Sequence, residues 1–527
     1  MDNIFELKEL VASQGEILAQ KDARIAELET LVKHYEELFR LTKSRQYGSS
    51  SEKGEVSNQL GLFDEVENTA DLSEPEQERE TITYSRSKRK GKRCEDFSSL
   101  PVEVIEYELP EEERTCPDCG NALHVMGHDS RKELKVIPAQ VRVVEHRYAV
   151  YACRSCEEGS VHVPIVKAPV PEPVIKGSYA SPSAVAQVMT QKYVMHVPLY
   201  RQEQDWLRQG VHLSRQTMAN WVTRCSEDWL CSVYDRLKDL LLQREVLHAD
   251  ETTCQVLNEP DKTPTSKSYM WLYRTGGDAD RHIILYEYQP GRSHVHPKTF
   301  LKSFKGYLHA DGYEGYHKLS HDITVVGCWA HMRRKWYDAL KVTGADARPD
   351  SIPQQAINKI GYLFHLERSW KDLPPEERFQ RRREESLPLA EEFFAWCADL
   401  SVTPKSAAGI AKHYTLNQKR WLMNVYRDGR TEFSNNRIEN SVRPFAVGRR
   451  NWLFFNSVKG AAASSIVYSL IETAKANGLK PFEYLVFLLE RIPNSRMSEI
   501  DSLLPWGDSV PDSCRFSPVS GSASGFV

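Results

Sequence analysis

Two short apolar segments of this chain end on the same three residues, His-Ala-Asp. The first segment, EVLHADET, ends its apolar run at Asp250, and the second, KGYLHADGYEGY, ends at Asp311. Short apolar runs bounded by turn residues are typical of buried strands, and the strand-like segments YMWLYRT and HIILYEY lie between them. An aspartate at a single strand end is usually a helix cap or a turn residue. Because the phrase occurs twice, we expect two carboxylates at the ends of neighbouring strands.

A sheet of this kind constrains both the fold and the chemistry of the chain. A sheet that is rich in antiparallel hairpins and has carboxylates at neighbouring strand ends suggests a ribonuclease-H-like layout, which we expect over residues 243–455. Hard divalent cations bind oxygen ligands, and Mg²⁺ in particular takes one or two carboxylates together with substrate phosphate. Asp250 and Asp311 are therefore candidate ligands of Mg²⁺ (or Mn²⁺).

Length and composition exclude several classes of protein. At 527 residues the chain is too long for one domain, and about three or four domains are expected. No run of 18 apolar residues could span a bilayer, and the first residues, MDNIFELKEL, lack the pattern of a secretory signal. We therefore expect a cytoplasmic protein without a membrane partner. The net charge of −4 argues neither for nor against nucleic acid, because local basic clusters matter more than the total.

A seven-residue apolar repeat occupies the N-terminal segment, residues 1–42. Such a period predicts a left-handed coiled coil that joins copies of the chain, although polar residues and Gly15 weaken the companion seam. The alternative is a single amphipathic helix that packs on the body of the protein. The repeat consists of Val11, Leu18, Ile25, Val32 and Phe39, and the companion seam of Leu7, Gln14, Lys21, Leu28 and Tyr35.

Residues 43–100 are poor in apolar residues and first acidic (EVENTADLSEPEQERE), then basic (SRSKRKGKR). Such a composition cannot bury enough apolar surface to fold, so we interpret this stretch as a linker. The basic half could lie on DNA phosphates without reading sequence, or it could be a solvated tether. Its candidate DNA-binding residues are Arg86, Lys88, Arg89 and Lys90.

Two CxxC pairs lie in the next segment, residues 101–168. Four thiolates in this pattern suit a tetrahedral Zn²⁺, and the residues between the pairs, KELKVIP and VRVVEHRYAVYA, alternate as strands do. We predict a zinc ribbon whose metal is structural, because four thiolates leave no open position. A redox-active CxxC is the alternative, which the presence of two pairs disfavours. The predicted zinc ligands are Cys116, Cys119, Cys153 and Cys156.

Residues 171–240 contain three helical patterns, SPSAVAQVMTQKYVM, PLYRQEQDWLRQG and SRQTMANWVTRCSEDW. The second ends at Gly210, and the third opens with Ser214 as its N-cap. This order is typical of a helix-turn-helix, whose second helix enters the major groove, although many helical hairpins share it without touching DNA. An apolar interior is offered by Trp206, Leu207, Met218 and Trp221. The candidate readers of bases or phosphates are Arg215, Gln216 and Asn220.

Several long phrases then carry a resemblance that extends over almost the whole chain. In order they are KSRQYGSSSEK, the paired CxxC, PLYRQEQDWLRQGVHLSRQTMANWV, HADET, LHADGYEGY, GCWAHMRRKW, NNRIENSVRPFAVGRRNWLFFNS, SLIETAKANGLKPFEYLVFLLERIP and LLPW. Together these phrases resemble the transposases of the insertion sequence sixty-six family, a group of DDE transposases.

The resemblance implies which residues are catalytic. Asp250 and Asp311 would be the first and second catalytic carboxylates, and Glu439 of NNRIEN the third, and all three would hold the metal ions. By residue pattern alone, Glu439 lies on a helical stretch whose face could equally be solvated, and Glu432 is the obvious substitute.

The resemblance also bears on the segment between the second and third carboxylates. Residues 343–428 are mostly helical and charged and would be an insertion in the catalytic fold. Cys328 and His331 form a CxxH that resembles a signature of related transposases. We expect it to play a supporting role near the metal ions.

The implied reaction is phosphodiester hydrolysis at the ends of an insertion sequence, followed by attack of the freed 3′-hydroxyl on target DNA, with two metal ions. No nucleotide cofactor is expected, because the chain has no GxxxxGK[ST] loop. The expected partners are DNA (element ends and target), further copies of the chain and accessory proteins, with which family members are often encoded.

Together these patterns predict a multidomain α+β and α/β protein. Beyond the catalytic domain we expect a helical C-terminal region over 456–506 and a tail over 507–527. One alternative is a DNA-binding protein without catalytic activity, which would not need the C-terminal half. Another is a transposase that has lost its activity, which the survival of all three carboxylates disfavours.

Overall fold

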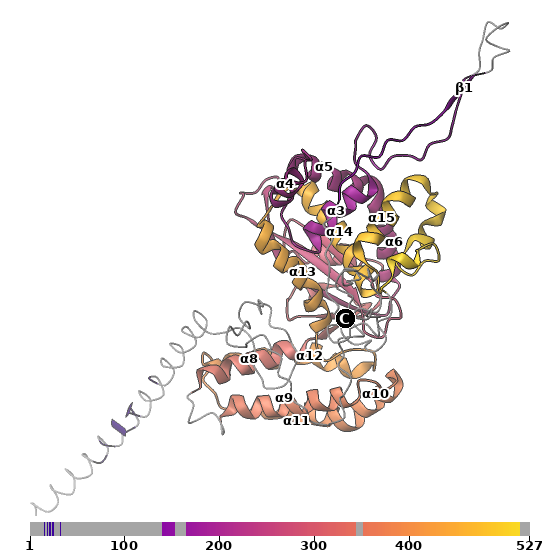
Figure 1. Cartoon of the computed structure of the whole chain (residues 1–527). Helices are drawn as coiled ribbons and strands as arrows, with labels where there is room; N and C mark the ends of the chain where they lie inside the picture. Colours follow the sequence, from indigo (N-terminus) through magenta and orange to yellow (C-terminus); the bar gives the residue numbers. More distant parts are fainter. Residues whose placement is uncertain are drawn as a thin grey trace, which may run out of the picture. The chain divides into compact units, whose positions relative to one another are not determined.

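The computed structural model describes residues 140–152, 165–343 and 351–516, and seven helical residues between Gly15 and Val32 (Figure 1). The predicted linker, the basic run Arg86 to Arg93 and the zinc ligands Cys116, Cys119, Cys153 and Cys156 lie outside the described residues. The chain divides into two compact units, and the larger contains residues 172–202 and 214–514.

The smaller unit contains one short strand pair among its described residues. Strand β1 (Val150–Ala152) pairs antiparallel with β2 (Ile165–Lys167). The alternation of VRVVEHRYAVYA predicts a strand over residues 141–152, but residues 140–149 have no regular structure and Val143 is 98% exposed. A strand needs a partner for its backbone groups, and within the described residues only β2 provides one to this segment.

A mixed sheet is the centre of the larger unit, and its strand order is β5-β4-β3-β6-β7. The long strand β3 pairs antiparallel with β4, and β4 pairs antiparallel with β5. On its other side β3 pairs parallel with β6, and β6 with β7, while β8 pairs parallel with the far end of β3. The strands are β3 (Val246–Asn258), β4 (Lys267–Thr275), β5 (Ile284–Gln289), β6 (Gly306–Ala310), β7 (Ile323–Gly327) and β8 (Phe455–Ser457). The mixed helix and sheet content agrees with the α+β prediction.

Helix α14 (Val458–Ala476) covers the edge strand β5. An edge strand exposes backbone groups that would otherwise pair with another chain. Here Thr473 Oγ1 bonds to both the N–H and the carbonyl of Ile284, each at 3.0 Å, and Ser469 Oγ accepts from the N–H of Tyr286 at 2.8 Å. The hydroxyls of α14 therefore replace a missing neighbouring strand.

Among the described residues, five further α-helices lie between β7 and α13 (Asn436–Trp452) (Figure 1). Their core contains Trp329, Trp336, Phe393 and Phe394, all 1% exposed or less. Helices α9 to α12 occupy the span of the predicted insertion, 343–428. The five are α8 (Trp329–Val342), α9 (Ile352–Ser369), α10 (Pro375–Arg381), α11 (Leu387–Asp399) and α12 (Ala407–Leu422).

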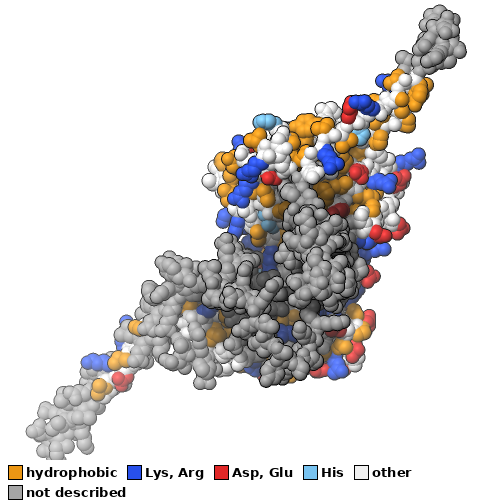
Figure 2. Space-filling view, in the orientation of Figure 1, with side chains coloured by type: hydrophobic (Ala, Val, Ile, Leu, Met, Phe, Trp, Pro, Cys, Tyr) orange, Lys and Arg blue, Asp and Glu red, His pale blue; other side chains and the backbone are white. Residues whose placement is uncertain are grey.

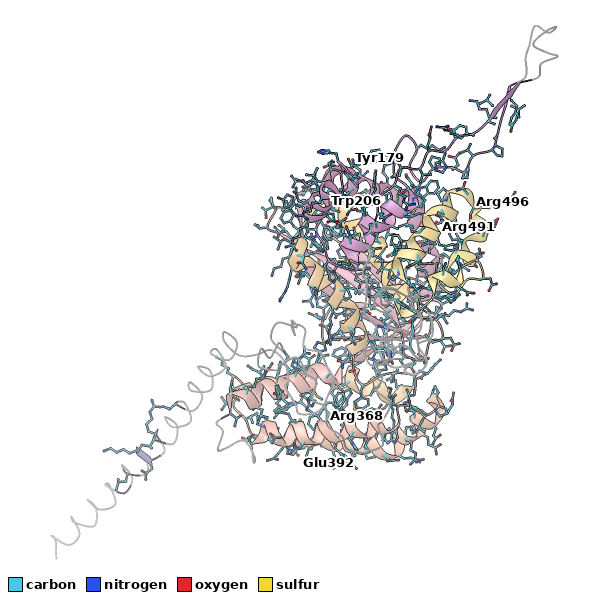
Figure 3. All side chains as sticks on the ribbon, in the orientation of Figure 1. Tyr179, Trp206, Arg368, Glu392, Arg491 and Arg496 are labelled. Atoms are coloured by element: carbon cyan, nitrogen blue, oxygen red, sulfur yellow. The ribbon has the colours of Figure 1, made fainter. Side chains whose placement is uncertain are left out.

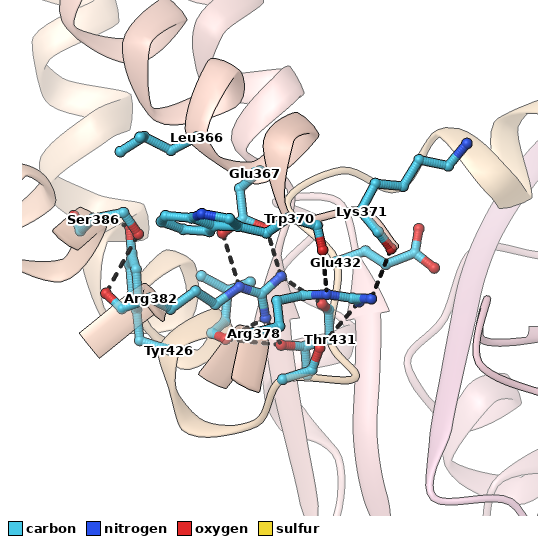
Figure 4. Close-up of polar contacts among 12 residues, drawn as sticks. Leu366, Glu367, Trp370, Lys371, Arg378, Arg382, Ser386, Tyr426, Thr431 and Glu432 are labelled. Atoms are coloured by element: carbon cyan, nitrogen blue, oxygen red, sulfur yellow. Dashed lines mark hydrogen bonds and ion pairs between the residues drawn. The ribbon is translucent and has the colours of Figure 1, made fainter. Parts of the chain in front are cut away.

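A buried arginine joins these helices to the segment that leads into helix α13. Arg382 is 1% exposed and donates to both carboxylate oxygens of Glu367, at 2.8 and 2.6 Å (Figure 4). It also donates to the hydroxyl and carbonyl of Thr431, at 3.2 and 2.9 Å. A buried guanidinium needs a full set of acceptors to offset its desolvation, and this one has them.

In the described residues from 172 onward, the α-helices before the sheet are α3 (Pro182–Tyr193), α4 (Leu199–Arg208), α5 (Arg215–Cys225) and α6 (Cys231–Leu242). Gly210, in the turn between α4 and α5, has φ +82°, which only glycine adopts without strain. Ser214 caps α5 as predicted, because its hydroxyl accepts from the N–H of Thr217 at 3.1 Å. Tyr179, labelled in Figure 3, packs edge-on against Trp221 of α5.

Helix α15 (Pro481–Arg491) follows α14 and packs against α3. Among the described residues, no helix combines the length and apolar character needed to span a membrane.

Candidate active site

The two His-Ala-Asp phrases lie side by side on the parallel strands β3 and β6. His248 of β3 is the register partner of His309 of β6, and Asp250 and Asp311 follow two residues later. Alternate residues of a strand share one face of the sheet. Asp250 thus lies on the face that carries His248, and Asp311 comes directly after the end of β6.

The surroundings of Asp250 disfavour its negative charge. Burial raises the pKa of this carboxyl well above its usual range, and the neighbouring charges of Glu251, Asp311 and Glu439 raise it further. One hydrogen bond acts in the opposite direction, from the N–H of Glu251 to Asp250 Oδ1 at 2.8 Å. Repulsion among clustered carboxylates is relieved when a cation binds between them.

Glu439 reaches this cluster from the first turn of α13, which packs on β3 and β4. Its Oε1 atom is buried and has no hydrogen-bond partner in the described part of the chain. Its Oε2 atom lies 3.9 Å from Nη2 of Arg334. A buried carboxylate oxygen without a donor is costly, and it fits a position where a hard cation would bind.

The CxxH lies at the start of α8, beside Glu439. His331 Nδ1 is 3.7 Å from Glu439 Oε1. One ligand atom each from Cys328, His331 and Glu439 lies within 4.8 Å of the others. Burial raises the pKa of the Cys328 thiol to about 11, and its sulfur accepts from the N–H of Asn435 at 3.2 Å.

The alternative third carboxylate, Glu432, is engaged in other contacts. Its Oε1 atom accepts from Arg437 Nε at 2.6 Å and from the N–H of Gly277 at 3.1 Å. Burial acts to raise its pKa, but His248, Arg437 and these hydrogen bonds together hold it below the usual value. Glu432 is thus engaged by Arg437 and Gly277, whereas Glu439 is among the groups whose charge raises the pKa of Asp250.

A buried polar network lies behind the two aspartates. The rings of His248 and His309 are fully buried and stack with centroids 4.4 Å apart. Asn435, 1% exposed, lies 2.8 Å through Oδ1 from His248 Nδ1, and its Nδ2 donates to the carbonyl of Ala249 at 3.0 Å. Burial lowers the pKa of both histidines, although Glu432 acts in the opposite direction on His248. No role was predicted for these residues from the sequence, although the histidine that occurs in both His-Ala-Asp phrases indicated two of them.

A second group of interacting side chains lies beside the aspartates and was also not predicted from the sequence. Glu251, whose side chain is 1% exposed, accepts from Arg292 Nε and from the hydroxyl of Tyr316, both at 2.6 Å. Arg292 is itself 43% exposed and lies over the ring of Tyr313, whose N–H donates to Asp311 Oδ1 at 2.8 Å. No sequence pattern connects Arg292, in the loop after β5, with these residues.

The predicted DNA-contacting residues of α5 lie on its exposed side. Arg215, Gln216 and Asn220 are exposed, and Gln216 Nε2 donates to Asn220 Oδ1 at 3.1 Å. Met218, on the opposite side, is buried, as is Trp221, whereas Leu207 of α4 is 46% exposed and does not belong to the predicted interior. The surface around α4 and α5 carries several Lys and Arg side chains (Figure 2).

Four family models match the chain. The model described as Transposase IS66 family matches residues 177–463, and the IS66 C-terminal element matches residues 469–506. The zinc-finger binding domain of transposase IS66 matches residues 113–157, which include all four paired cysteines. The model described as Transposase C of IS166 homeodomain matches residues 34–105, a range that overlaps the predicted linker.

Two similar proteins come from Sinorhizobium fredii. The uncharacterized protein y4qI is 30% identical over 96% of this chain and 97% of its own length, and the uncharacterized protein y4jD is 29% identical over 87% and 90%. Among solved structures, the Drosophila P element transposase strand transfer complex shares 11% identity over 61% of this chain and 94% of its own, with a TM-score of 0.21. The transposase model alone spans more than half of the 527 residues, and the chain therefore belongs to the IS66 family of transposases.

Proposed function

We propose that this protein is an active DNA transposase that uses divalent metal ions to cut the ends of an insertion sequence and to join them to target DNA. The observation that carries the proposal is the set of three carboxylates that three elements bring together. Asp250 comes from β3, Asp311 from the end of β6 and Glu439 from α13, and the latter two both act on the charge of Asp250.

We further propose that residues 243–455 form a ribonuclease-H-like catalytic domain. The support is the sheet itself, in which three antiparallel strands are followed by two parallel ones, with Asp250 on β3 and Asp311 directly after the adjacent parallel strand β6. In this interpretation α9 to α12 are the insertion that separates Asp311 from Glu439.

The three carboxylates supply oxygen ligands, which Mg²⁺ and Mn²⁺ prefer, and the unpartnered Glu439 Oε1 supports this assignment. Two bound ions would activate the attacking oxygen and stabilise the leaving oxygen of the phosphodiester. Arg292 and Arg334 are 43% and 57% exposed beside the cluster, so their guanidinium groups can hold a DNA phosphate next to it. The residues of the chain would position the DNA phosphodiester and neutralise its negative charge, as phosphoryl transfer requires.

The same proposal assigns the remaining parts. The zinc-finger model supports a structural Zn²⁺ held by Cys116, Cys119, Cys153 and Cys156. We infer that Arg215, Gln216 and Asn220 contact the ends of the element, while the basic run that contains Arg86, Lys88, Arg89 and Lys90 contacts phosphates. Copies of the chain would assemble through residues 1–42, since two ends must be held together, and accessory proteins of the same element would join them.

Replacing each carboxylate by its amide tests the proposal. Asp250→Asn, Asp311→Asn and Glu439→Gln keep the shape of each side chain and remove its negative charge. Each should lower cleavage and strand transfer by about 10³-fold or more in Mg²⁺, measured on labelled DNA that carries the element's ends, while binding to that DNA survives in a gel-shift assay. The double and triple variants should lose little more, because the three groups act as one unit.

Two controls accompany this experiment. Asp508→Asn, at an exposed position, should leave cleavage unchanged. If the Glu439→Gln variant cleaves DNA normally while Glu432→Gln does not, the assignment of Glu439 as the third metal ligand is wrong. A wild-type protein that binds the ends but never cuts them would instead favour the DNA-binding protein without catalytic activity.

A further inference from the structure

Asn435 uses all of its polar groups to join the elements that carry the candidate active site. It immediately precedes α13 and is 1% exposed. Its side-chain Nδ2 donates to the carbonyl of Ala249, the residue before Asp250, at 3.0 Å. Its Oδ1 lies 2.8 Å from His248 Nδ1. Because Nδ2 already donates to β3, Oδ1 is the acceptor in this bond and His248 Nδ1–H is the donor.

The backbone of Asn435 makes two further contacts. Its N–H donates to Cys328 Sγ at 3.2 Å, at the start of the helix that carries His331. Its carbonyl accepts from the N–H of Glu439 at 3.3 Å, in the first turn of α13. One side chain and its backbone therefore contact β3 next to Asp250, the CxxH and the residue Glu439 itself.

We propose that Asn435 is a positioning residue, which fixes Glu439 against Asp250 so that their carboxylates can hold metal ions together. This inference rests on the proposed function above. Glu439 lies 189 residues after Asp250 in the sequence, so only contacts across the fold can set the distance between them. The bonds from Asn435 to Ala249 and His248 connect the residue before α13 with β3. Groups that orient metal ligands typically contribute about 10- to 100-fold to metal affinity.

The chain offers a matched control in Asn424. This asparagine is 8% exposed, and its Nδ2 donates to the carbonyl of Val325 of β7 at 2.7 Å. It thus shares with Asn435 a buried amide that bonds to a strand backbone, but it is adjacent in sequence neither to α13 nor to a carboxylate of the cluster. A purely structural effect of losing a buried amide should appear in both positions.

The experiment compares Asn435→Ser with Asn424→Ser in the full-length protein. Mn²⁺ binding is measured as the rise in thermal unfolding midpoint with Mn²⁺ concentration, in the absence of DNA, because a ligand of the native state raises that midpoint. Asn435→Ser should need at least about tenfold more Mn²⁺ than wild type for half of the effect, and its cleavage should need correspondingly more metal. Asn424→Ser should follow the wild-type metal dependence even if its unfolding midpoint is lower.

Asp250→Asn separates this inference from the proposed function. If wild type and Asp250→Asn respond equally to Mn²⁺, the carboxylates hold no metal and the proposed function fails. If wild type responds and Asn435→Ser responds equally, the role of Asn435 is refuted while the proposed function stands. Should circular dichroism show Asn435→Ser to be unfolded, Asn435→Asp replaces it, because it keeps the acceptor for His248 and removes the donor to Ala249. An unchanged Mn²⁺ dependence in that variant would equally overturn the proposal.

Discussion

Partly buried ionisable side chains occur outside the candidate active site as well, and Glu287 of β5 illustrates the effect of burial on the charge of a carboxylate. Its Oε2 atom is buried and has no hydrogen-bond partner among the described residues. Burial raises its pKa from 4.5 to about 7, although Lys238 of α6 acts in the opposite direction. A glutamate with a raised pKa in the folded state holds its proton more tightly there than in the unfolded chain. Its contribution to stability is therefore favourable at low pH and is lost as the pH rises through about 7.

Glu287→Gln should accordingly stabilise the protein at pH 8 and leave it nearly unchanged at pH 4. The amide cannot ionise, so it avoids the cost that the wild-type carboxylate incurs above its folded pKa. The gain has an upper limit of about 3.5 kcal/mol, since each unit by which the pKa differs between the folded and unfolded states corresponds to about 1.4 kcal/mol. Thermal unfolding of both proteins at the two pH values measures the effect. Glu490→Gln, at an exposed position of α15, should show no such pH-dependent gain, and an equal gain there would refute the explanation.

At the level of elements, the features that could be predicted from the sequence are those that depend on a local pattern of residues. The strands that lead to Asp250 and Asp311 and the cap at Ser214 follow from runs of apolar residues and from a single hydroxyl. Contacts between distant segments could not be predicted in this way. Asn435 meets His248 across 187 residues, and Arg292 meets Glu251 through a loop without a recognisable pattern. The strand over residues 141–152 was wrong over most of its length, because alternation does not supply a pairing partner.

Helix α5 is the element whose function is most directly testable. If its N-terminal residues contact bases, Arg215→Ala, Gln216→Ala and Asn220→Ala should each weaken binding to the element's ends by about 1–3 kcal/mol and have little effect on random DNA. The losses of Gln216 and Asn220 should not add, because these side chains are hydrogen-bonded to each other. Fluorescence anisotropy with specific and random duplexes at fixed salt measures both affinities. Arg224→Ala, near the end of the same helix, serves as the control. Equal losses on both duplexes for the three variants would show that α5 does not read sequence.

At the scale of the whole molecule, the sheet is the frame on which distant segments meet. The helix that carries Glu439 lies on β3 and β4, α14 covers β5, and the helices after β7 hold the approach to α13 through Arg382. A substitution in any of these elements can therefore change the geometry of the carboxylate cluster without contacting it. A transposase must also hold two DNA ends at once, which one copy of this site does not provide, so activity should depend on assembly.

The N-terminal segment is where we expect that assembly to occur. Leu18, Ile25 and Val32 belong to the seven-residue repeat, are helical and are 60%, 53% and 56% exposed in the single chain. Apolar side chains at this spacing are normally covered by a second helix.

Deletion of residues 1–42 should therefore reduce the mass measured by light scattering to that of one chain, and strand transfer should fall with it. The sheet and its carboxylates should stay folded, as shown by an unchanged rise of the unfolding midpoint with Mn²⁺. Replacing only Leu18, Ile25 and Val32 by Ser should have the same effect on the mass, whereas Asp22→Ser, at an exposed position outside both seams, should not. An unchanged mass after the deletion would mean that the helix packs on its own chain and that the two DNA ends are brought together by another surface.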